Sequence, residues 1–224
     1  QVTIGVDNGE RLATKTLNGR LGIVGGLSIL GTTGIVVPYS CAAWIDTIHR
    51  GIDVARAMGL DHVAGSTGST SEAAVQKLHA MPDVALLEMG DFAGGLLKYL
   101  RNHPVARVTI AGGVAKMTKL AQGRLDLHSK RGEADLHALA AHTSDPALRS
   151  EIEASNTVAE AFAHASTRGI ALGDTVAAAA WEIAAAVLRP TTIDLEVVMF
   201  DRTGTLAGRQ PFRPVHAAPL NRRS

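Results

Sequence analysis

The sequence is poor in cysteine, and neither sign of charge dominates it. Its 224 residues include a single cysteine, Cys41, which excludes an internal disulfide and fits a reducing cytoplasm. Lysine and arginine total 22 against 21 for aspartate and glutamate, so no overall field favours nucleic acid. We therefore expect a cytoplasmic protein that binds no nucleic acid and holds any anionic ligand through a local cluster of cations.

Long hydrophobic runs are also absent. The longest apolar stretch, Val176 to Leu188, is too short to span a bilayer and contains Glu182. The first residues show no basic-then-apolar signal pattern. These two absences predict that the protein does not enter a membrane. Hydrophobic residues make up 46% of the chain, which is enough to bury a sizeable core.

Common catalytic motifs are missing as well. The sequence has no G-x-x-x-x-G-K-[ST] loop for a nucleoside triphosphate, and Gly25-Gly26-Leu27-Ser28 lacks the G-x-S-x-G nucleophile elbow. His128, His137 and His142 have no histidine partner four residues away and no cysteine to share a metal with. We therefore expect no protein-bound metal.

One strand-turn-helix unit occurs three times between residues 59 and 118. In each unit a short apolar run precedes a glycine-containing turn and then a stretch of helical period. Three such units predict an α/β fold with a doubly wound, mostly parallel, Rossmann-like sheet over residues 51–207. The expected strands are residues 62–64, 84–88 and 107–111.

The second half of that domain is expected to be mainly helical. Residues 133–188 are rich in alanine and should form helices broken near Asp145-Pro146 and near Gly169. Residues 193–200 then alternate as a last strand. This arrangement predicts helices that pack against the sheet and a strand that completes it.

The two ends of the chain lie outside this pattern. Val2 to Val6 alternates like a strand that has no earlier partner. We therefore expect residues 1–50 to be the remnant of an N-terminal α+β domain, preceding the Rossmann-like domain, whose other half is missing. Residues 208–224 contain prolines and arginines without periodicity and predict a mobile tail.

The turns that follow the three strands are the expected ligand site. In a doubly wound sheet, a ligand lies beyond the carboxyl ends of the strands, where helix amide groups point outward. Each turn could equally be an ordinary tight connection, and Asp91 could simply cap the next helix. The cofactor-binding residues that this rule predicts are Gly65, Ser66, Thr67, Gly68, Gly90, Asp91, Gly112 and Gly113.

A glycine-rich segment resembles the signature of a known family. Residues 18–40 read N-G-R-L-G-I-V-G-G-L-S-I-L-G-T-T-G-I-V-V-P-Y-S, which is similar to the CbiD signature. Segments 87–92, 111–121 and 126–132 also resemble that family, in its order. The sequence departs from the family in lacking an N-terminal portion with a G-Y-T-T-G-[ST]-C-A stretch, and Val37 stands where the family usually has arginine.

The resemblance implies a C-methyltransferase of anaerobic cobalamin biosynthesis. Such an enzyme moves the methyl group of S-adenosylmethionine to C-1 of cobalt-precorrin-5B and gives cobalt-precorrin-6A. Because a sulfonium methyl is reactive, alignment of carbon, methyl and sulfur can supply most of the catalysis without an acid/base dyad. The implied partner is the cobalt-precorrin substrate, and the sequence is compatible with a homo-oligomer.

The resemblance also implies roles for two further sets of residues. Thr32 and Thr33, in the glycine-rich loop, are the catalytic candidates, either by contacting the macrocycle or by assisting its deprotonation through water, although a structural role in the loop is an alternative. The carboxylates of the macrocycle need cations, although each cation could be only part of a solvated helix face. The substrate-binding candidates are Lys116, Lys119, His128, Lys130 and Arg131.

Two functions of other classes compete with this interpretation. A nucleotide-cofactor oxidoreductase should show G-x-G-x-x-G followed about 20 residues later by an acidic residue. Gly65-Ser66-Thr67-Gly68 does not have that spacing. A non-catalytic corrinoid-binding fragment would bind the macrocycle without binding S-adenosylmethionine.

Overall fold

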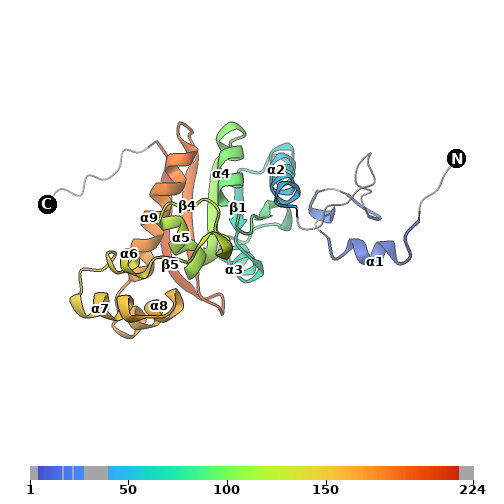
Figure 1. The fold of residues 1–224 in the computed structure, drawn as a ribbon. Coiled ribbons are helices and arrows are strands. Elements are labelled where there is room, and N and C mark those ends of the chain that lie inside the picture. The colour runs from blue at the N-terminus through green and yellow to red at the C-terminus, as the bar shows by residue number, and fades with distance from the viewer. Residues whose placement is uncertain (1–4, 17, 22, 28–39, 217–224) are drawn as a thin grey trace.

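The structure is a computed structural model that describes residues 5–16, 18–21, 23–27 and 40–216. At its centre is a five-stranded sheet in the order β2-β1-β3-β4-β5, in which β5 alone runs antiparallel to its neighbour (Figure 1). The predicted α/β fold with a mostly parallel sheet is confirmed. The strands are β1 (His62–Ser66), β2 (Leu86–Glu88), β3 (Arg107–Gly113), β4 (Asp194–Phe200) and β5 (Leu206–Pro214).

The parallel strands are buried on both faces. Successive side chains of a strand point to opposite faces, and two separate hydrophobic cores result. Val63 and Val197 join one core, whereas their neighbours Ala64 and Val198 join the other. This two-sided burial explains why the strands read as continuous apolar runs rather than as alternating patterns.

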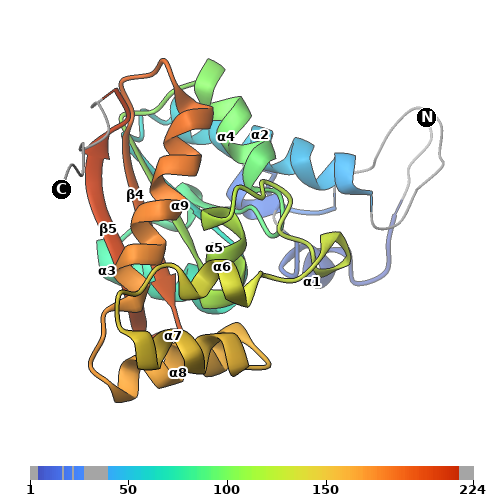
Figure 2. The same cartoon turned by 60° about the vertical axis from the view of Figure 1, so that its left-hand side comes forward.

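The larger core lies under four helices on one face of the sheet. The largest of its fully buried side chains, Trp181, lies on α9 and donates its indole N–H to the carbonyl of Leu195 at 2.7 Å. Figure 2 shows α9 running along β4 and β5. The four helices are α2 (Cys41–Ala57), α4 (Ala93–Asn102), α5 (Val114–Ala121) and α9 (Leu172–Leu188).

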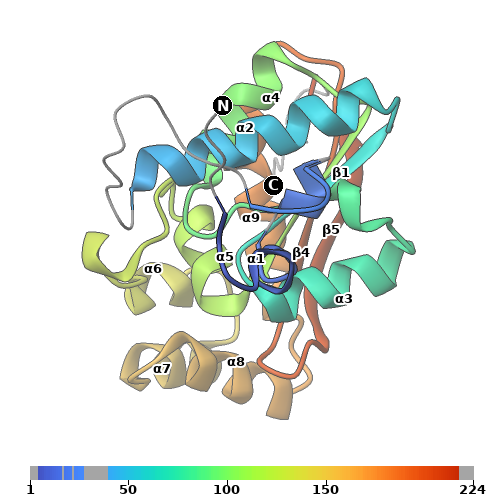
Figure 3. The ribbon, with the colours of Figure 1, turned by 90° about the vertical axis from the view of Figure 1, so that its right-hand side faces the viewer.

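The smaller core lies under α3 (Ser69–His79) on the opposite face. Val75 of this helix packs with Ala64, Ala111 and Val198, one from each of the three central strands. Figure 3 shows α3 and α9 on opposite sides of the strands. Helices therefore cover both faces of the sheet, and the helix after β1 and the helix after β3 leave the sheet on different sides.

The alanine-rich region is helical, as the sequence predicts, but it has one further break, between Ala154 and Val158. Asp145 accepts the backbone N–H of Leu148 at 2.6 Å and so caps a helix that has Pro146 in its first turn. Gly169 has φ +67°, a conformation that glycine adopts without strain, and it ends the next helix. Both predicted helix breaks are confirmed. The helices of this region, besides α9, are α6 (Leu136–Ala140), α7 (Pro146–Ala154) and α8 (Val158–Thr167).

The prediction of a mobile tail over residues 208–224 is wrong for residues 208–214. Residues 206–214 form β5, which pairs with β4. The arginines that made this segment look solvated are held by partners: Arg209 lies 2.6 Å from a carboxylate oxygen of Glu196, and the guanidinium carbon of Arg213 lies 3.6 Å from the centre of the Trp181 ring. Prolines are tolerated because β5 is an edge strand. Residues 217–224 lie outside the described part of the chain.

The predicted domain boundary after residue 50 falls inside a continuous helix. α2 spans residues 41–57, and Ile48, Ile52 and Ala55 on it are buried in the larger core. The first turns of α2 therefore belong with the sheet. The predicted strand at Val2 to Val6 lies mostly outside the described residues, and the described Gly5 and Val6 are not in a strand.

Short helices complete the described chain. α1 (Gly9–Ala13) buries none of its residues and lies apart from the sheet (Figure 1). Arg20, in η1, reaches α3 and forms a two-pronged ion pair with Glu72, with distances of 2.8 and 3.0 Å. The 3₁₀ helices are η1 (Asn18–Leu21), η2 (Asp83–Ala85) and η3 (Ser129–Arg131).

Candidate functional site

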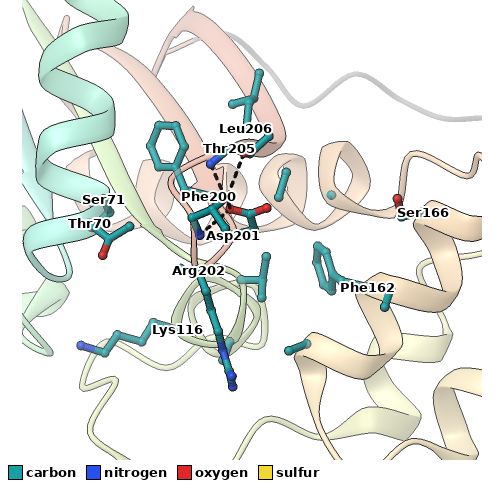
Figure 4. Close-up of a pocket in the computed structure, with 18 of the residues that line it drawn as sticks. Thr70, Ser71, Lys116, Phe162, Ser166, Phe200, Asp201, Arg202, Thr205 and Leu206 are labelled. Carbon is teal, nitrogen blue, oxygen red and sulfur yellow. Dashed lines mark hydrogen bonds between the residues drawn. The ribbon is translucent and has the colours of Figure 1, made fainter.

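A cavity of about 880 Å³ opens at the carboxyl edge of the sheet. It lies beyond the ends of β1, β3 and β4, beside the first turns of α3, α5 and α9, and against one side of α8 (Figure 4). Elements that are far apart in the sequence thus meet around one volume. The residues of its wall that matter below are Thr67, Gly68, Gly113, Lys116, Phe162, Asp201 and Arg202.

The topology of the sheet places the cavity there. β1 and β3 are neighbours in the sheet, but the chain leaves them toward opposite faces, which opens a crevice between the two turns. Thr67 joins these turns, because its N–H donates to the carbonyl of Ala111 at 3.0 Å and its hydroxyl accepts the N–H of Gly113 at 3.4 Å. The floor of the cavity is therefore fixed by backbone pairing.

Two helices begin at this wall without a side-chain cap. Gly68 precedes α3 and Gly113 precedes α5, and neither glycine can cap its helix with a side chain. A Cβ atom added to either glycine would meet nothing within 4 Å, so both face open space. The first N–H groups of a helix carry partial positive charge and seek acceptors. This part of the wall can therefore donate hydrogen bonds to a ligand.

Lys116 contributes a cation from the first turn of α5. Its ammonium lies 2.8 Å from the carbonyl oxygen of Thr67 and 3.1 Å from a carboxylate oxygen of Asp91. Asp91 follows β2, so this pair connects the ends of β1, β2 and β3. The Lys116 side chain is 36% exposed, which leaves it room to contact a ligand in the cavity.

The turn between β4 and β5 supplies an anion. The Oδ1 atom of Asp201 accepts hydrogen bonds from the Thr203 N–H at 2.8 Å, the Thr203 hydroxyl at 2.7 Å and the Thr205 N–H at 2.9 Å. These bonds, that of the Thr203 hydroxyl above all, lower the pKa of the Asp201 carboxyl. Asp201 is therefore ionised and held in one orientation at the wall of the cavity.

The remaining wall is apolar. Phe162 and Ala163 of α8, Leu172 of α9 and Leu206 of β5 line it. The start of α9 is pressed directly against β5, because a Cβ atom on Gly173 would lie 1.8 Å from the carbonyl oxygen of Ala207. This contact between two backbones fixes the apolar wall relative to the end of β4.

Half of the predicted cofactor residues lie at the cavity or in contact with its wall. Thr67, Gly68 and Gly113 line it, and Asp91 forms an ion pair with Lys116. Ser66 lies just beneath, where its buried hydroxyl has no hydrogen-bond partner among the residues that the structure describes.

Three of the predicted glycines serve packing instead. A Cβ atom on Gly65 would lie 2.3 Å from the side chain of Leu96, and one on Gly112 would lie 2.6 Å from the sulfur of Met117. Both lie within strands, because β1 and β3 run further than the sequence indicates. Gly90 has φ +56° and lies under the ring of Trp44, 3.2 Å from where its Cβ would be. None of the three lines the cavity.

The predicted cation cluster is not a single cluster. Of its members only Lys116 lines the cavity. Lys119 is buried and donates to the carbonyl of Leu127 at 3.2 Å, because it lies on the inner side of α5. The remaining three occupy an exposed loop at η3, where Arg131 pairs with Asp126 at 3.1 Å. They are His128, Lys130 and Arg131. The catalytic candidates Thr32 and Thr33 lie outside the described residues.

Sequence reasoning missed one side of the cavity. The strand over 193–200 was predicted, and the strand-end rule applied to it would have pointed to Asp201 and Arg202. Phe162 gives no such signal, because an aromatic residue in an alanine-rich helix is equally compatible with a place in the hydrophobic core and with a place at a cavity.

Two other kinds of site are not found in the described part of the chain. No three histidine, cysteine, aspartate or glutamate side chains come together there in a way that could hold a metal ion. None of the described helices has the length and apolar character needed to cross a membrane.

Comparisons with known proteins give a consistent result. The model of the CbiD family matches residues 1–38, and the model of the CbiD C-terminal domain matches residues 126–211. The chain is 60% identical over 210 residues to the cobalt-precorrin-5B C(1)-methyltransferase of Halorhodospira halophila, with 92% of this chain and 56% of the relative covered. It is 59% identical to the protein of the same name from Agrobacterium fabrum, with 96% and 58% covered, and 58% identical to that of a Bradyrhizobium species, with 99% and 60% covered.

The chain spans 56 to 60% of the length of these three relatives. No solved structure matches it.

Proposed function

The chain belongs to the CbiD family, and from this premise we propose that it carries the greater part of a cobalt-precorrin-5B C(1)-methyltransferase. The reaction moves the methyl group of S-adenosylmethionine to C-1 of cobalt-precorrin-5B and gives cobalt-precorrin-6A in anaerobic cobalamin biosynthesis. The observation that carries the proposal is the identity of 58 to 60% to three relatives of that name. Because the chain covers little more than half of each, the activity belongs to the whole protein.

The cavity at the carboxyl edge of the sheet fits an adenosyl ligand. Its volume of about 880 Å³ lies within the range of roughly 300–1,000 Å³ that is common for small-molecule sites. One wall is apolar and can take a purine ring, while the opposite wall offers backbone donors and the ammonium of Lys116. We assign the binding of S-adenosylmethionine to this cavity, with Thr67, Gly68, Gly113 and Lys116 as contacts.

The chain contributes alignment rather than acid/base chemistry. S-adenosylmethionine supplies a methyl group on a positively charged sulfur. The bond between methyl and sulfur breaks with its electron pair on sulfur, which gives S-adenosylhomocysteine, and an electron pair of the macrocycle forms the new carbon–carbon bond at C-1, so that the positive charge passes to the macrocycle. A rigid cavity that holds the donor in one orientation removes much of the entropic barrier to such a transfer. The backbone bonds of Thr67 and the close contact at Gly173 provide that rigidity.

We place the sheet among the doubly wound, Rossmann-like folds. Helices on both faces and a crevice between β1 and β3 support this placement. We further propose that the residues before α2 belong to a second domain and that Thr32 and Thr33 act on the macrocycle. For the macrocycle's carboxylates we propose three partners, the exposed cations at η3: His128, Lys130 and Arg131.

We propose a cytoplasmic location for the protein.

The competing functions predict different ligands. A nucleotide-cofactor oxidoreductase has no support from the relatives, which are named methyltransferases. A corrinoid-binding fragment without catalysis would bind the macrocycle and leave the cavity at the sheet edge without an adenosyl ligand.

Calorimetry with S-adenosylhomocysteine tests the proposed site. Gly68→Val should weaken binding by roughly tenfold or more, because its side chain would occupy open space at the wall of the cavity, where the ligand is proposed to bind. Gly68 has φ 168°, an extended conformation open to any residue, so the fold should persist. Gly5→Val, at another glycine with nothing within 4 Å, is the matched control. Equal affinity of both variants would remove the cavity from the cofactor site.

The reaction itself requires the full-length protein. Conversion of cobalt-precorrin-5B in the presence of S-adenosylmethionine, followed by mass spectrometry of the corrinoid, should show the gain of one methyl group. Absence of that product from a folded protein that binds both ligands would refute the proposed activity.

A further inference from the structure

The turn that follows β4 holds a carboxylate with one oxygen occupied and one oxygen free. All three hydrogen bonds to the Asp201 side chain go to Oδ1, from Thr203 and Thr205. The Oδ2 atom makes no hydrogen bond or ion pair within the described residues. Because the turn itself uses only Oδ1, the second oxygen is not needed to hold the fold.

The free oxygen can only accept hydrogen bonds. The pKa of the Asp201 carboxyl is lowered by the same bonds that fix the turn, so the carboxylate stays ionised at neutral pH. A ligand beside it must therefore present hydroxyl or amino groups. S-adenosylmethionine has three such groups: the hydroxyls of its ribose, the ammonium of its methionine part and the amino group of its adenine.

The position of Asp201 between two unlike walls distinguishes these groups. Figure 4 shows Lys116 and Phe162 on opposite sides of it, with Arg202 extending away from Asp201. The cations Lys116 and Arg202 suit the carboxylate of the methionine part, and the ring of Phe162 suits the adenine. The ribose connects these two ends of the ligand and therefore falls beside Asp201.

We infer that Asp201 binds the ribose hydroxyls of the adenosyl ligand through its Oδ2 atom. This inference rests on the proposed function, and it adds a specificity-determining residue that comes from the fourth strand rather than from the first three. The turn of residues 200–205 then acts as a rigid holder, because the bonds to Oδ1 fix the carboxylate at the wall of the cavity and leave Oδ2 to the ligand.

Ligand analogues test the inference without any mutation. Calorimetry on the full chain compares S-adenosylhomocysteine with its 2′-deoxy and 3′-deoxy analogues. Loss of a hydroxyl that donates to a carboxylate should weaken binding roughly 10- to 100-fold. If neither analogue binds more weakly than S-adenosylhomocysteine, the inference is overturned while the proposed cofactor site stands.

The variant Asp201→Asn gives a second test. Asparagine keeps an oxygen for the three bonds of the turn and replaces the free oxygen with an amide NH₂. Affinity for S-adenosylhomocysteine should fall roughly 10- to 100-fold, and in this variant the further loss caused by the deoxy analogues should shrink to roughly threefold or less. Asp194→Asn, at the other end of β4 and outside the cavity, is the matched control and should leave affinity unchanged.

5′-Methylthioadenosine, which lacks the amino-acid part, separates the ribose from the ammonium. Asp201→Asn should weaken its binding as much as that of S-adenosylhomocysteine. An effect on S-adenosylhomocysteine alone would assign Asp201 to the ammonium and overturn the inference. If the wild-type protein binds no adenosyl compound at all, the cofactor site in the proposed function fails together with it.

Discussion

Glu196 lies on β4 and Asp201 lies five residues later, in the turn that follows it, yet the surroundings of the two carboxylates differ completely. Glu196 is fully buried in the sheet and accepts hydrogen bonds from His79 at 2.6 Å, Thr109 at 2.8 Å and Arg209 at 2.7 Å, so both of its oxygens are satisfied. Asp201 lies at the cavity with one oxygen satisfied and the other without a partner among the residues that the structure describes. A saturated carboxylate stabilises a fold, whereas a half-saturated one at a cavity is available to a ligand.

The histidines beside Glu196 belong to the same structural group. His62 stacks edge-on against His79, with ring centres 5.0 Å apart, and its Nε2 lies 2.9 Å from the hydroxyl of Thr109. Because that hydroxyl donates to Glu196, the His62 nitrogen must be the donor to it. The ring of Phe212 covers both histidines. The network therefore joins β1, β3, β4 and β5 on the α3 face.

The largest expected effect is on stability, at the saturated carboxylate. Glu196→Ala leaves Arg209 and His79 without their partner and should lower the free energy of unfolding by about 3 kcal/mol. Urea denaturation followed by circular dichroism measures the change. Glu153→Ala removes a carboxylate from the surface, where it pairs with His137, and should cost far less.

The variant Glu196→Ala also tests whether the two carboxylates have different roles. If folded Glu196→Ala lost as much affinity for S-adenosylhomocysteine as Asp201→Asn, the network would belong to the binding site, and the division into a structural and a binding carboxylate would be wrong.

The sequence predicted the architecture better than the site. Strand-turn-helix order and the breaks at Pro146 and Gly169 depend on local chemistry, so they could be derived from single segments. The role of Gly65 could not, because its need for a bare Cα comes from Leu96 on a different helix. The strand-end rule located the cavity, since the ends of parallel strands share one edge, but it could not tell which glycine in each turn faces open space.

The predictions made from charged residues, the cation cluster and the mobile tail, failed because they also depend on contacts between distant segments. Lys116 and Lys119 are one helical turn apart, yet one lines the cavity and the other is buried against Leu127. β5 appeared mobile because its arginines have partners that lie 13 and 31 residues away in the sequence, Glu196 and Glu182. Pairing at such separations leaves no local signal.

An intermediate effect is expected from the pH dependence of stability. Burial, and then the charges of His79 and Arg107, lower the pKa of His62 from 6.5 to about 4. Between those two values the unfolded chain binds a proton that the folded protein does not, so stability should fall as the pH drops from 6.5 to 4. Because the ring is only partly buried, the loss should be about 1 to 2 kcal/mol.

His62→Gln isolates this contribution, because the glutamine amide can still donate to Thr109 but does not titrate. Its stability, measured in urea at several pH values, should show a shallower slope between pH 6.5 and 4 than the wild type. Burial also lowers the pKa of His142, which should maintain a residual slope in the variant. An unchanged slope would mean that His62 titrates normally in the folded protein.

The smallest expected effect is on the stability of the Asp201→Asn variant, and it separates the roles of the two carboxylates most clearly. Asp201→Asn keeps an acceptor for Thr203 and Thr205 and lies at the surface of the cavity, so the free energy of unfolding should change by about 0.5 kcal/mol. The same substitution is expected to weaken the binding of an adenosyl ligand by an order of magnitude or more. Glu196→Ala should show the reverse, with a large loss of stability and unchanged affinity. Urea denaturation and calorimetry on the two variants therefore form a crossed pair, and a large loss of stability in Asp201→Asn would show that its carboxylate is structural too.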